Sequence, residues 1–299
     1  MTLKRQTTES QLNFPSDGLI LVNKPPGMRT TELLNKVKSL LYLKRAGHGG
    51  TLDPFAEGLI LILYGKATKL MDYIGDEKEY LGTIKLGEVT DTDDPDGKII
   101  REGEVPSLTK KEVEKVFSRF KGSFNQVVPL YSAVKKNGER LYNKARKGEK
   151  IKSLPYREVL VKEFDLVDFS PPFLEFRCLA HRGTYMRSLA RDVGEALGCG
   201  AHLSKLIRIR VGPYEIDDSW KLSDIEKGNF EIIEFREALP HLKTITLRED
   251  AVWDFVHGGK VRGFYPRGLY QVKDNRGNLL GIAKGETYAV QPIKVFSDS

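Results

Sequence analysis

Residues 46–62 read AGHGGTLDPFAEGLILI, a glycine-rich loop followed by a purely apolar run. The run 59–63 has the length and composition of a buried strand. Glycines at 47, 49 and 50 let the backbone approach a ligand closely, and Asp53 is held in front of the rigid Pro54. An Asp-Pro pair after glycines is also typical of a plain turn, and the Lys-Ser/Thr ending of a phosphate-binding loop is missing. The segment therefore leaves a turn and an active site built on Asp53 as open alternatives.

Outward from this segment, short strands and amphipathic helices are interspersed along the chain, which predicts an α+β fold. Strands are expected at 18–23, 59–63, 78–86, 158–169, 173–180 and 206–211. Helices are expected at 31–41, 109–120, 184–197 and 229–239, the second opening with a capping box of Thr109 and Glu112. The acidic stretch 88–96 is expected to be a loop.

The last 50 residues have the pattern of a small module of their own. A helix at 248–257 precedes short strands at 269–273, 280–283 and 288–295, with a turn at 275–277. Domains are therefore expected at 1–245 and 246–299.

Charge gives the first indication of function. The 299 residues include 48 Lys and Arg against 41 Asp and Glu, a net charge of +7. Residues 135–157 contain nine basic residues and two acids, so this segment carries as much net charge as the whole chain. Concentrated positive charge attracts a polyanion, although a solvated basic loop has the same composition.

Several other classes of protein are disfavoured. No apolar stretch approaches the roughly 20 residues that span a bilayer, and the N-terminus lacks the apolar core of a secretory signal. Cys178 and Cys199 suggest neither a disulfide framework nor a metal site, so a cytoplasmic protein is expected. The five histidines lack metal-ligand spacing, and 91–97 departs from a calcium loop in the placement of its glycine and Pro95. No metal is therefore expected.

A resemblance extends the interpretation. The blocks GLILVNKPPGM (18–28), AGHGGTLDPFAEGLILI (46–62), ATKL (67–70), KEYLGTIKLGEVTDTDDPDG (78–97), VPLYSAVKKNGERLYNKARKG (128–148) and HRGTYMRSLARDVGEALGCGAHLSKLIRIRVGPY (181–214) occur in this order. In sequence and order they resemble the TruB family of tRNA pseudouridine synthases. The family usually has Thr at the place of Gly49. Residues 248–295 are similar to the PUA-like RNA-binding module that ends bacterial members.

The resemblance implies a standalone enzyme that isomerises uridine 55 in the T-loop of tRNA to pseudouridine. No cofactor is implied, because the atoms of the substrate are only rearranged. The implied partner is the T-arm of tRNA, with no membrane and no obligatory protein partner, and a monomer is expected. An RNA-gripping insertion is expected at about 104–150 within the catalytic domain, and it includes Lys144, Arg146 and Lys147.

The resemblance also implies roles for individual residues. Asp53 is the catalytic carboxylate, and Arg187 pairs with it and keeps it ionised. Tyr80 stacks on the target base and helps to remove the C5 proton. His48 fills the gap left when the target nucleotide leaves the stack. The remaining implied site residues are Leu206 and Tyr185, which line the pocket, and Lys24, which supports the active-site loop.

Three alternatives remain in view. The guide-RNA-dependent, dyskerin-like branch of the superfamily requires protein partners and has a larger PUA domain. A non-catalytic RNA-binding protein would not need Asp53, Tyr80 and Arg187 together. An N-glycosidase would need an activated water and usually a second carboxylate, for which Glu57 is near in sequence. Whether the carboxylate attacks C1′, adds to C6 or removes the C2′ proton stays open.

Overall fold

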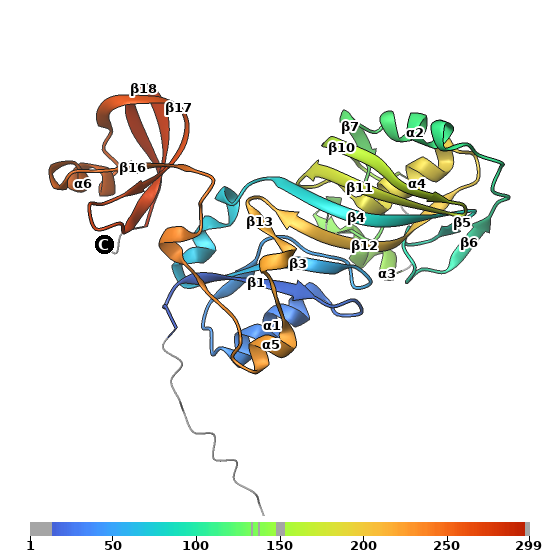
Figure 1. Ribbon diagram of the computed structural model, residues 1–299, viewed down its shortest axis with the longest axis horizontal. Helices are drawn as coiled ribbons and strands as arrows, with labels where there is room; N and C mark the ends of the chain where they lie inside the picture. The colour runs from blue at the N-terminus through green and yellow to red at the C-terminus, as the bar shows by residue number, and fades with distance from the viewer. Residues whose placement is uncertain (1–13, 133, 137, 148–152, 297–299) are drawn as a thin grey trace, which may run out of the picture.

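The computed structural model describes residues 14–132, 134–136, 138–147 and 153–296, without the side chains of 135, 136, 140 and 144–146. Within this part of the chain, a mixed sheet of eleven strands forms the body of the molecule (Figure 1). Its main path runs in the order β14 (Trp220–Lys221), β1 (Gly18–Lys24), β3 (Glu57–Tyr64), β12 (Ala201–Val211), β4 (Glu77–Leu86), β11 (Phe173–His181), β10 (Tyr156–Ser170) and β7 (Gly122–Val127). Short strands β2 (Ala46–His48), β13 (Tyr214–Glu215) and β15 (Ile233–Glu234) pair with β3, β12 and β1.

The hydrophobic pattern predicts the longer strands of this sheet, which are β1, β3, β4, β10, β11 and β12. In β3, residues 59–63 are all buried because the strand lies between β1 and β12 and has core on both faces. In β11, Leu174, Phe176, Cys178 and Ala180 are buried in alternation, as expected for a strand with one buried face. Most pairings are antiparallel; β1 with β14 and β12 with β3 are parallel. The predicted α+β class is confirmed.

Helices pack on one face of the sheet and form the larger core. They are α1 (Thr30–Leu40), α2 (Lys110–Ser118), α4 (Met186–Ala196) and α5 (Leu222–Glu226). Phe117 of α2 stacks on Phe164 of β10 with ring centroids 4.2 Å apart. The capping box of Thr109 and Glu112 is present as predicted. The 3-10 helix η1 (Gly65–Tyr73) belongs to a second apolar cluster, with Leu19, Leu59 and Leu61.

Two local predictions were wrong. The expected loop at 88–96 begins with β5 (Glu88–Thr90), which pairs with β6 (Ile99–Glu102). The expected helix at 229–239 is instead β15 followed by the 3-10 helix η3 (Phe235–Glu237). The reason lies in its side chains: Ile232 packs on the larger core and Ile233 on the second cluster, so neighbouring residues point to opposite faces as in a strand.

A separate three-stranded sheet lies at one end of the molecule (Figure 1). It consists of β16 (Lys243–Thr246), β17 (Val261–Lys273) and β18 (Leu279–Val295), accompanied by α6 (Glu249–Val256). The strands expected at 280–283 and 288–295 are one continuous strand, β18. The chain enters this sheet at Lys243, and a domain boundary at residue 245 stays a prediction.

The last elements belong to the basic segment and to the exit from β12. They are β8 (Lys135–Lys136), β9 (Glu139–Arg140), α3 (Leu141–Arg146) and the 3-10 helix η2 (Ile216–Asp218). Among the described residues, no helix is both long and apolar enough to cross a membrane.

Candidate active site

A cavity of about 510 Å³ opens where the loop after β2, strands β4 and β12, and the start of α4 meet. Its lining includes Asp53, Tyr80, Tyr185, Arg187 and Leu206, so five of the residues singled out in the sequence lie around one space. They come from sequence positions up to 153 residues apart, and the sheet order brings them together.

Asp53 and Arg187 form a two-pronged ion pair at this cavity. Arg187 donates from Nε to Asp53 Oδ2 over 2.9 Å and from Nη2 to Oδ1 over 3.1 Å. The arginine is buried, whereas the Asp53 side chain is 32% exposed. The expected pair is therefore present, and it fixes the orientation of the carboxylate while leaving part of it open to the cavity.

Arg187 is itself held by two further segments. Its Nη1 donates to the carbonyl of Thr92 over 2.9 Å, and its Nη2 to the carbonyl of Tyr131 over 3.0 Å. The carboxylate of Asp94 lies 3.5 Å from Nη1. Burial raises the pKa of Asp94, against the opposing effects of the Thr92 hydrogen bond and of Arg187.

The sequence does not single out Asp94 as a site residue, because the stretch 91–97 departs from a calcium loop and the resemblance of the block 78–97 assigns no role to this aspartate. The neighbouring Asp93 binds Arg191 of the same helix over 3.1 Å. The two adjacent acids thus hold two arginines of α4 that are four residues apart and on one helix face. Two arginines four residues apart on a helix, together with two consecutive acids elsewhere in the chain, are the sequence signal that could have indicated these ion pairs.

Tyr80 is almost completely buried in β4, opposite Cys178 of β11 and Arg208 of β12. Burial raises the pKa of its hydroxyl, and the charge of Arg208 and its hydrogen bond to the hydroxyl oppose that rise. Arg208 is also buried, and it donates to the carbonyls of Leu59 (2.8 Å) and Gly50 (3.0 Å). Arg208 thus connects the phenol to the glycine-rich loop, a link that no motif indicated.

Lys24 does not line the cavity. It is fully buried, and its Nζ donates to the carbonyls of Pro25 (2.8 Å), Met28 (2.7 Å) and Pro54 (3.1 Å). Burial lowers the pKa of Lys24 to about 8, although Asp53 and Glu57 oppose the shift. The lysine therefore ties the turn after β1 to the residue that follows Asp53.

His48 lies on β2, opposite Ile62, and outside the lining of the cavity. Burial lowers its pKa, and the charges of Arg208 and Lys78 act in the same direction, which favours the neutral ring at pH 7. The next residue, Gly49, donates to the carbonyl of Leu61 over 2.9 Å. A Cβ at Gly49 would lie 3.2 Å from the Leu61 Cβ, so a threonine there requires a small shift of that leucine.

Tyr185 and Leu206 both line the cavity. The backbone of Tyr185 exchanges two hydrogen bonds with the Gln126 side chain, at 2.9 Å and 3.0 Å, which fixes the chain just before α4. Leu206 is 6% exposed and presents an apolar side chain to the same space.

The basic segment reaches the cavity through α3, because Tyr142 of this helix is one of the lining residues. Lys147 is exposed, and its Nζ lies 2.7 Å from Glu139 Oε1. Lys144 and Arg146 belong to α3, but their side chains lie outside the described part of the chain, as do Lys150 and Lys152 altogether.

Models of known families match most of the chain. Residues 38–186 match the N-terminal domain of the TruB family pseudouridylate synthases, and residues 187–241 match the C-terminal domain of tRNA pseudouridylate synthase B.

Individual proteins agree with this match. The tRNA pseudouridine synthase B of Francisella philomiragia subsp. philomiragia is 36% identical over 282 residues, which cover 94% of this chain and 91% of that protein. The tRNA pseudouridine synthase B of Xanthomonas campestris pv. campestris is 38% identical, with 90% of each chain covered. A chain in a crystal structure of a Cbf5-Nop10-Gar1 complex superposes with a TM-score of 0.70 at 25% identity, covering 95% of this chain and 84% of that one.

Proposed function

Because the chain belongs to the TruB family of pseudouridylate synthases, we propose that it converts uridine 55 in the T-loop of tRNA to pseudouridine, with Asp53 as the catalytic carboxylate. The observation that carries this proposal is the two-pronged pair of Asp53 and Arg187 at a cavity that Tyr80 and Leu206 also line. A single oriented carboxylate that stays partly open to a cavity is what chemistry at a glycosidic carbon requires.

The roles of the cavity residues follow from the bonds that change. Isomerisation breaks the C1′–N1 bond of uridine, turns the base and forms a C1′–C5 bond, after which C5 loses a proton and N1 gains one. Asp53 acts at the sugar or the base, and the two hydrogen bonds from Arg187 hold its carboxylate in a fixed orientation. Tyr80, whose hydroxyl is next to Arg208, contacts the target base and takes part in removing the C5 proton. Leu206 and Tyr185 shape the wall against which the base turns.

The rest of the molecule binds the RNA. His48 fills the stack after the nucleotide flips out, and its neutral ring suits that apolar gap. Lys144, Arg146 and Lys147 contact phosphates of the T-arm, and residues 246–299 act as the PUA-like module. The enzyme works as a monomer in the cytoplasm without an obligatory protein partner. The relatives that carry the name tRNA pseudouridine synthase B favour this standalone form over the guide-RNA-dependent branch.

An unmodified tRNA incubated with this protein alone tests the proposal. Mass spectrometry is expected to find pseudouridine at position 55 and no released uracil. Free uracil would instead indicate the N-glycosidase, and a need for added guide RNA or protein would indicate the other branch of the superfamily.

Asp53→Asn is expected to abolish turnover and to leave tRNA affinity nearly unchanged, because the amide keeps the shape of the side chain and removes its charge. Asp168→Asn, at an exposed position on β10, is the matched control and should behave like the parent. Turnover by Asp53→Asn within tenfold of the parent would remove Asp53 from the catalytic role.

A further inference from the structure

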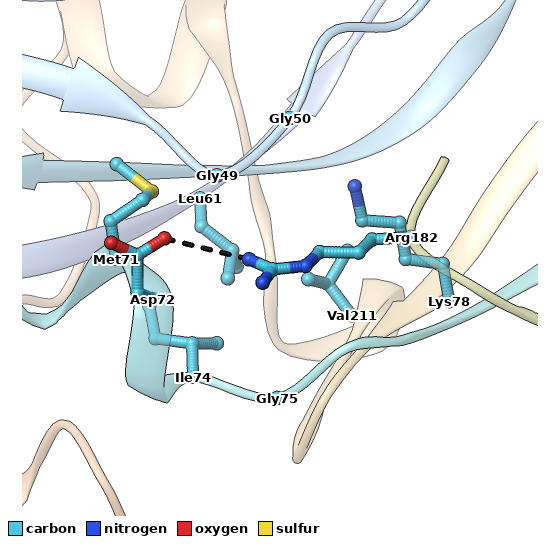
Figure 2. A pocket seen from close by; sticks show the side chains of 10 residues that line it. All are labelled: Gly49, Gly50, Leu61, Met71, Asp72, Ile74, Gly75, Lys78, Arg182 and Val211. Atoms are coloured by element: carbon cyan, nitrogen blue, oxygen red, sulfur yellow. Dashed lines mark hydrogen bonds and ion pairs between the residues drawn. The ribbon is translucent and has the colours of Figure 1, made fainter. Parts of the chain in front are cut away.

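A second, smaller cavity of about 180 Å³ lies beside the glycine-rich loop (Figure 2). Gly49, Gly50 and Leu61 form one side of it. Met71, Asp72, Ile74 and Gly75, around the end of η1, form another. Lys78 lines this cavity and also lines the larger one that contains Asp53. The side chain of Lys78 therefore lies at the junction of the two.

The amine of Lys78 lies directly against the backbone of Gly50. A Cβ at this glycine would collide with Lys78 Nζ, and the φ of +111° at Gly50 is in any case unfavourable for other residues. Gly50 is three residues before Asp53, so the position of the amine is coupled to the loop that carries the catalytic carboxylate.

The charges around Lys78 are mostly positive. Arg208 and Arg182 have the largest electrostatic effects on Lys78, and Asp76 opposes them. Arg182 occupies the available carboxylates: its Nε lies 2.8 Å from Asp76 Oδ1, and its Nη1 lies 3.5 Å from Asp72 Oδ1, the contact dashed in Figure 2. Within the described part of the chain, the structure gives the Lys78 amine no hydrogen-bond or ion-pair partner.

Such a cation is unfavourable in the free protein, since it has lost part of its hydration and faces like charges. Burial is the largest cause that lowers the pKa of Lys78 to about 7, followed by Arg208 and Arg182. An anion placed in the small cavity would remove this unfavourable energy. If the proposed function holds, the anion that reaches this position is a phosphodiester of the RNA next to the flipped nucleotide.

We propose that Lys78 binds a backbone phosphate adjacent to the target uridine and that the small cavity beside Gly50 is the subsite for this phosphate. Lys78 is then a substrate-binding residue that couples the entry of the nucleotide to the geometry of the loop carrying Asp53. Arg182, which stays paired with Asp72 and Asp76, also lines the subsite.

The test measures binding of a T-arm hairpin in the Asp53→Asn background, where no turnover interferes. Lys78→Met is expected to weaken binding roughly tenfold or more, as loss of a charge-assisted hydrogen bond does. The slope of log affinity against log salt should become shallower by about 0.7, the value for one contact to a single strand. Lys85→Met is the control, because Lys85 is at the other end of β4 and pairs with Glu88.

A scan with neutral methylphosphonates identifies the phosphate. Replacing the contacted phosphate, 5′ or 3′ of the target, should weaken binding of the Lys78-containing protein and have little further effect with Lys78→Met. The proposal would be overturned if each methylphosphonate weakened binding as much with Lys78→Met as with the Lys78-containing protein. It would also be overturned if Lys78→Met bound the hairpin as tightly as the Lys85→Met control.

Measurements of thermal stability and of turnover distinguish a misfolded variant, a failed subsite and a failed function from one another. Thermal unfolding checks that Lys78→Met is folded, and Lys78→Gln serves as a second neutral variant. Lys78→Arg should restore most of the affinity if charge is what matters. Turnover of the same hairpin by the unmodified protein tests the proposed function independently, so a failed subsite and a failed function give different results.

Discussion

Arg187 shows how much of the site depends on one side chain. It joins Asp53 of the glycine-rich loop to the Thr92 and Tyr131 carbonyls and to Asp94. A planar guanidinium can satisfy these acceptors at once because its five N–H groups point outward in a fixed fork. The arginine therefore fixes the position and orientation of the Asp53 carboxylate.

Arg187→Lys is expected to lower kcat by about 100-fold, because lysine keeps the charge but cannot orient both carboxylate oxygens. KM for tRNA should change little, since most affinity comes from phosphate contacts elsewhere. Single-turnover rates at saturating tRNA measure the effect, with Arg177→Lys as the control on an exposed strand position. A loss confined to KM would assign Arg187 to substrate binding.

The lowered pKa of Lys24 predicts how the free energy of unfolding depends on pH. Its pKa is about 8 in the folded protein and 10.5 ordinarily, so between these values the unfolded chain holds a proton that the folded chain has released. The free energy of unfolding of the parent should therefore rise with pH across this window relative to Lys24→Met, by about 3 kcal/mol in total. Below pH 8 the difference between the two proteins should be constant. Urea unfolding at pH 7, 8.5 and 10 measures it, and a difference that does not change with pH would contradict the assigned shift.

At the scale of elements, α3 and the hairpin of β5 and β6 bring residues from outside the large sheet to the candidate active site. α3 places Tyr142 at the cavity and continues into the basic segment. The residues after β5 supply Asp93 and Asp94 to α4. α3 follows the small sheet of β8 and β9, whereas Asp93 and Asp94 follow β5 in the small sheet of β5 and β6. Both segments nevertheless contribute to the same cavity, because Tyr142 of α3 lines it and Asp94 helps to hold Arg187.

Neutralising Lys144, Arg146 and Lys147 together to glutamine should weaken tRNA binding and flatten its salt dependence. Three phosphate contacts would reduce the slope by roughly two to three units, and the pair of Lys147 with Glu139 favours the lower figure. Maximal rate at saturating RNA should be nearly unchanged. The same substitutions at Lys110, Lys111 and Lys115, three exposed lysines of α2, are the control. Equal slopes for the parent and the basic-segment variant would mean that this segment lies away from the RNA.

Thr109→Ala tests the start of α2. It removes the acceptor for the Glu112 backbone N–H and the donor to the Glu112 carboxylate. The expected loss is about 1 kcal/mol in the free energy of unfolding, the usual cost of removing a cap. Chemical denaturation measures it, and unchanged stability would mean that packing of Val113 and Phe117 alone maintains the helix.

At the scale of the whole molecule, the C-terminal module is packed on the body. Leu279, Ile282 and Phe296 are buried in the same cluster as Leu19 and Leu61 of the large sheet. Phe296 also meets Phe235 edge to face, with ring centroids 5.3 Å apart. The module therefore contributes to the stability of the body in addition to any contact with RNA.

A chain ending at Leu242 should bind tRNA more weakly and also unfold at a temperature about 10 °C lower, because it exposes part of the second cluster. Its kcat on a saturating T-arm hairpin, measured well below that temperature, should stay within a few-fold of the parent. Phe296→Ala in the full chain separates the two effects, since it should lower stability without weakening binding. A large loss of kcat in the shortened chain would place part of the catalytic apparatus in the module.

The sequence by itself determined the α+β class, the longer strands of both sheets and the helices α1, α2, α4 and α6, and its motifs, through the family resemblance that they carry, indicated Asp53, Tyr80 and Arg187 as candidates. These depend on hydrophobic period, capping residues and short motifs, all of which act over a few neighbouring residues. Only the tertiary structure decided that β15 is a strand, because the opposite faces of Ile232 and Ile233 have meaning only beside β1. It also decided the surroundings of Asp94, Arg208 and Lys78, whose partners or neighbouring groups come from distant parts of the chain. A charged residue looks the same in a sequence whether it is solvated or buried. Its surroundings, set by the order of strands in the sheet, determine what it does.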